Sequence, residues 1–161
     1  IIIAFLPIFG CKYAIMGQAL RKQTYTPLHV LTNGDSSYPS TERMLRIIDA
    51  SKKGVSATQL KNLLQEIGLN MKELAEILPV SYSSLSKKKS FSPEVSERIY
   101  ALSILYRLGI DVFNDKDIFT RWLRKPNQAI GGSVPFDLLG SNLGMDIVRD
   151  ELLRIEHGLF A

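Results

Sequence analysis

Residues 70–89, NMKELAEILPVSYSSLSKKK, carry the strongest local signals in the chain and predict two short helices joined by a tight turn. Asn70 is a favoured helix N-cap, and Glu73 stands at the third helical position, where its side chain completes a capping box. Pro79 ends this first helix because proline supplies no backbone N–H and crowds the preceding turn. Ser81 is then placed to cap a second helix.

The second helix has one apolar anchor, Leu85, and its other residues are expected to face outward. Hydroxyl groups at its start suit base edges, and the lysines that follow suit phosphates. We expect all three lysines to lie on this one short helix. The expected DNA contacts are Ser81, Tyr82, Ser83, Ser84, Ser86, Lys87, Lys88 and Lys89. A plain helical hairpin with a solvated lysine face is the alternative interpretation of the same residues.

The pattern L-A-x-x-L-x-V-S-x-x-x-L-S over residues 74–86 resembles the helix-turn-helix of Xre/Cro-type regulators. Ala75 fits this resemblance because a small residue lets the two helices cross closely. Pro79 departs from it, since such motifs usually have at the turn a glycine able to take the positive φ that proline cannot adopt.

The composition is that of a globular protein, with 161 residues of which 45% are hydrophobic and 22% charged. The net charge of +4 is unevenly spread: residues 43–89 hold nine Lys/Arg against four Asp/Glu, whereas residues 126–161 hold two against five. The single cysteine, Cys11, permits no internal disulfide and fits a reducing cytoplasm. His29 and His157 are far apart in the sequence, so no metal site is expected.

Residues 1–9, IIIAFLPIF, are wholly apolar, but the stretch is too short to span a membrane and lacks the basic start of a secretory signal. No membrane association is expected. The chain begins with Ile, and we expect the native start at Met16; a fragment with a stray leader is the alternative. The segment that follows, up to Ser40, is polar and rich in turn residues, which indicates a flexible arm.

Two further helices are expected before the 70–89 stretch, each marked by a capping residue. Ser40 caps a helix that ends near Gly54, and its buried face is expected to hold Met44, Leu45, Ile47 and Ile48. Ser56 and Gln59 form a capping box ahead of an apolar stripe made by Leu60, Leu63, Leu64 and Ile67. Gly68 ends that helix.

Beyond the 70–89 stretch, Ser92-Pro93-Glu94 opens a helix that we expect to end at Gly109. The segment from Asp111 to Asn114 is interpreted as a junction, with Asn114 capping the next helix. Apolar residues at helical spacing predict the inward face of that next helix, made by Ile118, Phe119, Trp122 and Leu123. Lys125-Pro126 ends it.

The C-terminal third combines a turn-rich segment with a final helix. Gly131-Gly132 allows a sharp reversal, and Pro135 opens a one-turn helix that Gly140 closes. Ser141 caps the final helix, which is expected to end at Gly158. Its buried face is expected to hold Ile147, Val148, Leu152 and Ile155.

Two patterns in this third carry a second resemblance: N-x-A-x-G-G-x-x-P-x-D-L-L over residues 127–139 and R-I-E-x-G-x-x-A over residues 154–161. Together they resemble the toxin-binding domain of Xre/MbcA/ParS-type antitoxins. Residues 55–110 also match the Xre-like helix-turn-helix domain of that family, so the resemblance covers roughly two thirds of the chain.

The resemblance implies a type II antitoxin that pairs with a RES-domain toxin that consumes NAD, forms a homodimer, binds its own operator DNA and blocks the toxin with its C-terminal domain. The toxin contacts expected on this basis are Arg154, His157, Gly158, Leu159, Phe160 and Ala161. An apolar tail beyond a helix end suits a partner's pocket. Ordinary structural roles, with Arg154 pairing to a neighbour and His157 interacting with helix-end carbonyls, are the alternative.

The sequence thus predicts an all-α protein with an apolar leader and arm at residues 1–39, an Xre-like helix-turn-helix bundle at 40–112 and a small helical toxin-binding domain at 113–161. No nucleophile–base pair, paired carboxylates or phosphate-binding glycine loop stands out, so neither a catalytic residue nor a cofactor is expected. The alternative function is a stand-alone dimeric helix-turn-helix transcription regulator, and an enzyme is the weakest interpretation.

Overall fold

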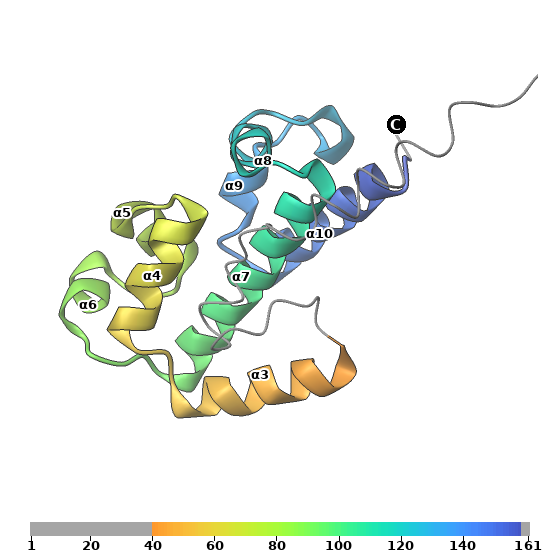
Figure 1. Ribbon diagram of the computed structural model, residues 1–161. Coiled ribbons are helices and arrows are strands. Elements are labelled where there is room, and N and C mark those ends of the chain that lie inside the picture. The colour runs from red at the N-terminus through yellow and green to blue at the C-terminus, as the bar shows by residue number, and fades with distance from the viewer. Residues whose placement is uncertain (1–39, 159–161) are drawn as a thin grey trace, which may run out of the picture.

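The computed structural model describes residues 40–158, and these residues form helices with no β-strand among them, so the predicted all-α class is confirmed (Figure 1). The predictions about the leader, Met16 and the arm lie outside the described residues. The helices, in chain order, are α3 (Thr41–Lys53), α4 (Ala57–Ile67), α5 (Met71–Ile77), α6 (Tyr82–Lys87), α7 (Pro93–Phe113), α8 (Lys116–Leu123), the 3-10 helix η2 (Gln128–Ile130), α9 (Pro135–Leu138) and α10 (Asn142–Glu156).

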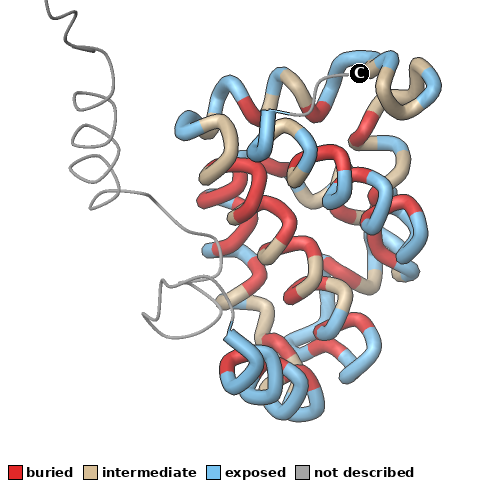
Figure 2. The backbone as a smooth tube through the Cα atoms, turned by 90° about the vertical axis from the view of Figure 1, so that its right-hand side faces the viewer, coloured by how far each residue is buried: buried red, intermediate tan, exposed pale blue. Residues whose placement is uncertain are grey.

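The long helix α7 lies at the centre, and α3, α4, α8 and α10 pack against it. In Figure 1, α4, α5 and α6 lie to its left and α10 to its right. Its buried residues occupy nearly its whole circumference, and Figure 2 shows buried positions gathered in the interior of the molecule. Two buried hydroxyls of α7 are hydrogen-bonded: Ser103 donates to the Tyr100 carbonyl within the helix (2.7 Å), and Ser96 accepts from the N–H of the distant residue Val55 (2.8 Å).

The caps predicted at Ser40, Ser56, Asn70, Ser81 and Ser141 are confirmed, whereas Ser92 precedes α7 without a side-chain cap hydrogen bond. Ser56 with Gln59 and Asn70 with Glu73 form complete capping boxes, and the Ser81 and Ser141 side chains accept from backbone N–H groups of the helices that they open. These interactions span only three residues, so the local sequence is sufficient to specify them.

The predicted end of α7 at Gly109 is wrong, because the helix continues to Phe113. A methyl group at Gly109 would overlap the Phe119 ring, so glycine is needed here for the close approach of α8 and not for a turn. The left-handed residue that ends α7 is Asn114 (φ 52°), and the cap of α8 is Asp115, not Asn114.

Three predicted buried faces need correction. On α3 the buried residues are Arg43, Ile47 and Ser51, whereas the exposed ones include Met44, Leu45 and Ile48. On α10, Ile147 is exposed while Met145 and Glu151 are buried, and on α8, Ile118 is exposed. Helical spacing shows which residues share a side of a helix, but the direction from which a neighbour approaches selects the stripe that is covered.

Glu66 in the last turn of α4 is a buried carboxylate at the boundary with α8. It is 2% exposed, and its Oε2 atom has no hydrogen-bond partner in the described part of the chain. Burial raises its pKa from 4.5 to about 7, and the positive charge of Lys116 at the start of α8 lowers it in part. Ionised Glu66 is therefore a cost to the fold at neutral pH.

Arg98 on α7 connects the two halves of the chain. Its guanidinium donates to the Leu139 carbonyl (2.9 Å) and the Ile77 carbonyl (3.4 Å), and also to the Asn142 side chain. Burial lowers the pKa of Arg98 below its ordinary value. The end of α5 and the turn between α9 and α10 thereby share one donor, although the sequence offers no motif that marks Arg98.

A second polar link between the halves is made by Arg124, which follows α8. Its guanidinium pairs with the Glu73 carboxylate of α5 (2.7 Å) and lies over the Phe136 ring, 5.6 Å from the centroid. Glu73 thus caps α5 and holds α8 at the same time.

Glu66→Gln should make stability less dependent on pH. Below pH 4.5, Glu66 of the parent is neutral in both the folded and the unfolded protein. Between pH 4.5 and 7, Glu66 is ionised in the unfolded protein but still protonated in the folded one. The free energy of unfolding therefore falls as pH rises through this range. Urea unfolding should show the variant more stable than the parent by roughly 1–3 kcal/mol at pH 8 and nearly equal at pH 4. Glu76→Gln, at an exposed position on α5, serves as control. A parent-like pH profile in Glu66→Gln would contradict this assignment.

Arg98→Ala should lower the free energy of unfolding by roughly 1–3 kcal/mol, because the Ile77 and Leu139 carbonyls lose a charged donor. Arg98→Lys should restore only part of the loss, since an ammonium cannot reproduce the fork of the guanidinium. Arg121→Ala, at an exposed position on α8, should shift the urea midpoint little. Equal midpoints for the two alanine variants would show that the link is dispensable.

Candidate functional surfaces

The turn between α5 and α6 is built without a left-handed residue. Leu78 is extended (φ −91°, ψ 148°), and its N–H donates to the Leu74 carbonyl (2.9 Å) as the C-cap of α5. The Val80 N–H then donates to the Leu78 carbonyl (2.8 Å) across Pro79. Because no residue of this turn has a positive φ, the proline that departs from the usual motif is compatible with the two-helix geometry.

The short helix α6 is held by one buried side chain, Leu85, which is 2% exposed. The hydroxyl of Ser81 accepts from the Ser84 N–H, and the hydroxyl of Ser86 donates to the Ser83 carbonyl (3.1 Å). Ser84 is half-buried, whereas Ser81, Tyr82, Ser83 and Ser86 are exposed. The half-exposed Tyr82 at the first helical position is thus the largest side chain that α6 presents to solvent.

Lys87, Lys88 and Lys89 are all exposed. The prediction that they lie on one helix is wrong. Lys87 is the last residue of α6, Lys88 is its extended C-cap and Lys89 lies beyond it. A six-residue helix is too short to hold all of them. The Lys89 carbonyl accepts from the Ala57 N–H (2.9 Å), which holds this segment at the start of α4. Within residues 40–158, none of the three lysines forms an ion pair.

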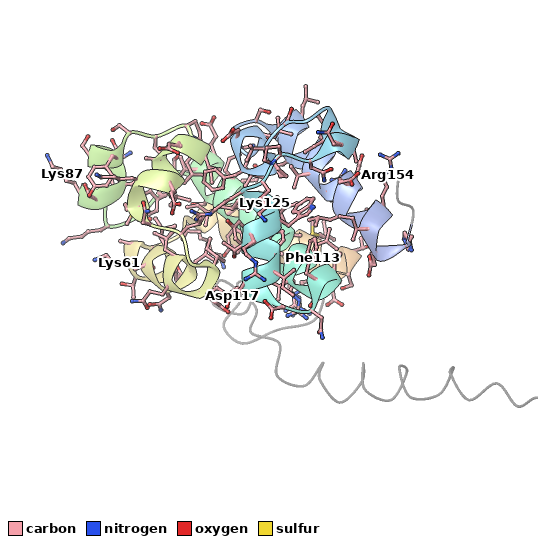
Figure 3. All side chains as sticks on the ribbon, turned by 90° about the horizontal axis from the view of Figure 1, so that it is seen from above. Lys61, Lys87, Phe113, Asp117, Lys125 and Arg154 are labelled. Atoms are coloured by element: carbon pink, nitrogen blue, oxygen red, sulfur yellow. The ribbon has the colours of Figure 1, made fainter. Side chains whose placement is uncertain are left out.

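The helix-turn-helix pattern does not include two other exposed cations of this half of the chain, Lys53 and Lys61. Lys61 on α4 and Lys87 on α6 lie toward the same end of the molecule in Figure 3, and both are exposed. Lys53 ends α3 directly before Gly54, which approaches the Phe91 carbonyl and the Ser90 hydroxyl. A single helix-turn-helix pattern omits such residues because they come from neighbouring helices, although the basic character of residues 43–89 indicated them.

The N-x-A-x-G-G pattern closes a compact turn. The Asn127 side-chain oxygen accepts from the Ala129 N–H (2.9 Å), and the Asn127 backbone carbonyl accepts from the Gly132 N–H (2.9 Å). Gly131 and Gly132 have φ of 70° and 76°, which favours glycine at both positions. Asn127 and the two glycines therefore shape the backbone, whereas Asp137 on α9 is exposed.

Three of the predicted toxin contacts, Arg154, His157 and Gly158, lie in the described part of the chain, at the end of α10. Arg154 is exposed and its guanidinium lies 3.5 Å from the Glu151 carboxylate. His157 is the exposed C-cap, its N–H donating to the Leu153 carbonyl (3.1 Å), and Gly158 has φ 69°. The predictions for Leu159, Phe160 and Ala161 lie outside the described residues. In Figure 3, Arg154 and Lys87 lie at opposite ends of the molecule.

Two features are absent from residues 40–158. No group of three or more His, Cys, Asp or Glu side chains is placed to hold a metal ion. No described helix combines the length and the apolar character that crossing a membrane requires.

Comparison with known protein families places a match on each half of the chain. Residues 46–103 match the Antitoxin Xre-like helix-turn-helix domain, which includes α4–α6 and half of α7. Residues 108–158 match the Antitoxin Xre/MbcA/ParS C-terminal toxin-binding domain, which includes α8–α10. The two matches meet inside α7.

The chain is also similar to proteins that are named antitoxins, and the similarity covers most of their length. The chain is 31% identical over 127 residues to the Prs ADP-ribosylating antitoxin of Sphingobium sp. (strain YBL2), covering 71% of this chain and 80% of that protein. It is 27% identical over 120 residues to Antitoxin Xre of Yersinia enterocolitica, covering 71% and 81%. With the helix-turn-helix and the C-terminal domain both matched, the chain belongs to the Xre/MbcA/ParS family of antitoxins.

Proposed function

We propose that this antitoxin belongs to a type II system, neutralises a RES-domain toxin that consumes NAD by binding it directly, and represses its own operon as a homodimer on operator DNA. The observation that carries the proposal is the joining of an Xre-like helix-turn-helix domain to a toxin-binding domain in one chain. The name of the Sphingobium relative supports the link to NAD, since ADP-ribosylation uses NAD as donor.

The proposed DNA-binding surface is α6 with the segment that follows it. Tyr82 and Ser83 open the helix, the end that meets base edges in helix-turn-helix proteins, so we assign specificity to them and to Ser84. The lysines at 87–89 are exposed and contact phosphates in this proposal. The hydroxyls of Ser81 and Ser86 bond within α6 and position the helix.

The proposed toxin-binding surface is the end of α10 with the tail beyond it, made by Arg154, His157, Gly158, Leu159, Phe160 and Ala161. Its support is the exposure of Arg154 and His157 and the acidic balance of this part of the chain. Because Lys87 lies at the other end, operator and toxin have separate surfaces to bind (Figure 3).

In this proposal the antitoxin works in the cytoplasm, needs no cofactor and catalyses no reaction itself. Membership of an antitoxin family supports a binding protein rather than an enzyme. A stand-alone transcription regulator, the alternative, would use the C-terminal domain only to dimerise, so its operator affinity would not change when a toxin is co-expressed.

Deleting residues 158–161 should release the toxin while leaving the protein folded, because the buried residues of α10 all precede this segment. The test is co-expression of a cognate RES-domain toxin, with cell growth and NAD level as readouts and circular dichroism as the check on folding. The full chain should protect the cells. Failure of the full chain to bind this toxin would refute the proposed partner, whereas full protection by the truncated chain would refute only the role of the tail.

Changing Lys87, Lys88 and Lys89 to Gln should reduce the salt dependence of operator binding, by about 0.9 in the slope of log affinity against log salt for each lysine that contacts a phosphate. Fluorescence anisotropy on an operator fragment at several salt concentrations gives the slope. Arg121→Gln with Lys125→Gln, exposed cations outside this surface, should leave it unchanged. A parent-like slope in the triple variant would refute the phosphate contacts.

A further inference from the structure

A groove of about 460 Å³ lies on the toxin-binding domain, apart from the tail residues discussed above. It is bounded by the end of α7, the end of α8, the segment that leads into η2, and α10. The residues that matter here are Phe113, Trp122, Ala129, Ile155 and Glu151. Figure 3 labels Phe113 and Lys125, which both line it.

The aromatic wall of the groove is held in place from behind. Phe113 and Trp122 are half-buried with ring centroids 5.5 Å apart, and both rings contact Phe119, at 6.0 Å and 6.1 Å between centroids. Phe119 is fully buried against Gly109 and Tyr106. The part of each outer ring that the core leaves uncovered is thus available as a fixed aromatic surface.

The acidic residue of the groove is Glu151, which is 7% exposed. Its ion-pair partner among the described residues is Arg154, at 3.5 Å, and Arg154 is itself more than half exposed. Charge-assisted hydrogen bonds are usually 2.7–2.9 Å long, and a carboxylate has room for several donors. Glu151 therefore combines strong burial with a single long ion pair, which leaves its carboxylate able to accept a further donor at the groove.

We propose that this groove receives the guanidinium of an arginine side chain from the toxin, an inference that rests on the proposed function. The Phe113 and Trp122 rings are tilted by 43° to each other, so a planar guanidinium stacks on one of them while its N–H groups pair with Glu151. The toxin-binding domain matched over residues 108–158 holds eight Asp/Glu against six Lys/Arg, a small acidic excess that favours the approach of a cation. The rim cation Lys125 is exposed, so solvent screens its repulsion.

Other occupants satisfy the site less well. An apolar side chain would bury Glu151 further without giving it a donor. A lysine would pair with the carboxylate but would not stack flat on the rings. These differences between side chains make the occupant testable with small probes.

The first test uses N-acetyl-L-arginine amide as probe and the fluorescence of Trp122, the single tryptophan of the chain, as readout. The fluorescence of the full chain should change saturably with the arginine probe. The neutral analogue N-acetyl-L-citrulline amide should bind more weakly by about tenfold or more. Glu151→Gln should abolish the preference for arginine. Asp150→Asn, an exposed neighbour with the same change of charge, should retain it. Absence of saturation, or equal responses to the two probes, would overturn the proposal.

The second test measures affinity for the co-expressed RES-domain toxin, after circular dichroism and urea unfolding show that both variants are folded. Glu151→Gln should weaken binding about tenfold or more, whereas Asp150→Asn should change it less than about twofold. Equal affinities for the two variants would overturn the arginine contact and leave the proposed function standing. A parent chain that does not bind the toxin would instead refute the proposed partner, while the response to the arginine probe would still report on the groove.

Discussion

The burial of α7 on nearly its whole circumference is the constraint on which the rest of the molecule depends. A helix that is buried on nearly its whole circumference must be covered from several directions, and α3, α4, α8 and α10 each cover part of it. The helices around it are short, and α6 has only six residues. Helices of this length are marginal in water by themselves, so packing against the core stabilises them. The position of each surface follows from the way its helix meets that core.

A shared helix also explains how the two parts of an antitoxin are joined. The two family matches meet within α7, so a continuous helix and not a flexible loop connects them. Arg98 and the Arg124–Glu73 pair add polar links between the same halves. The boundary between residues 112 and 113 remains a prediction. A rigid connection keeps the basic segment after α6 and the end of α10 at opposite ends of one body (Figure 3).

Buried charges mark the places where the packing of this protein is least favourable. Glu66 is enclosed between α4 and α8 with a raised pKa, and Glu151 is enclosed beside an aromatic groove with a distant partner. The two differ in their surroundings: Glu66 faces Lys116 inside the described part of the chain, whereas Glu151 borders a groove wide enough for another molecule.

The sequence by itself determined the helix caps, the stop at Pro79, the helix-turn-helix and the family, because those signals lie within a few residues of each other or in position-specific patterns. It also indicated the basic and acidic halves. Only the tertiary structure decided that α7 passes through Gly109, that Met44 and Ile147 are exposed, and that Glu151 borders an aromatic groove. These outcomes depend on which neighbouring helix covers a given side, and residues distant in the sequence supply that neighbour.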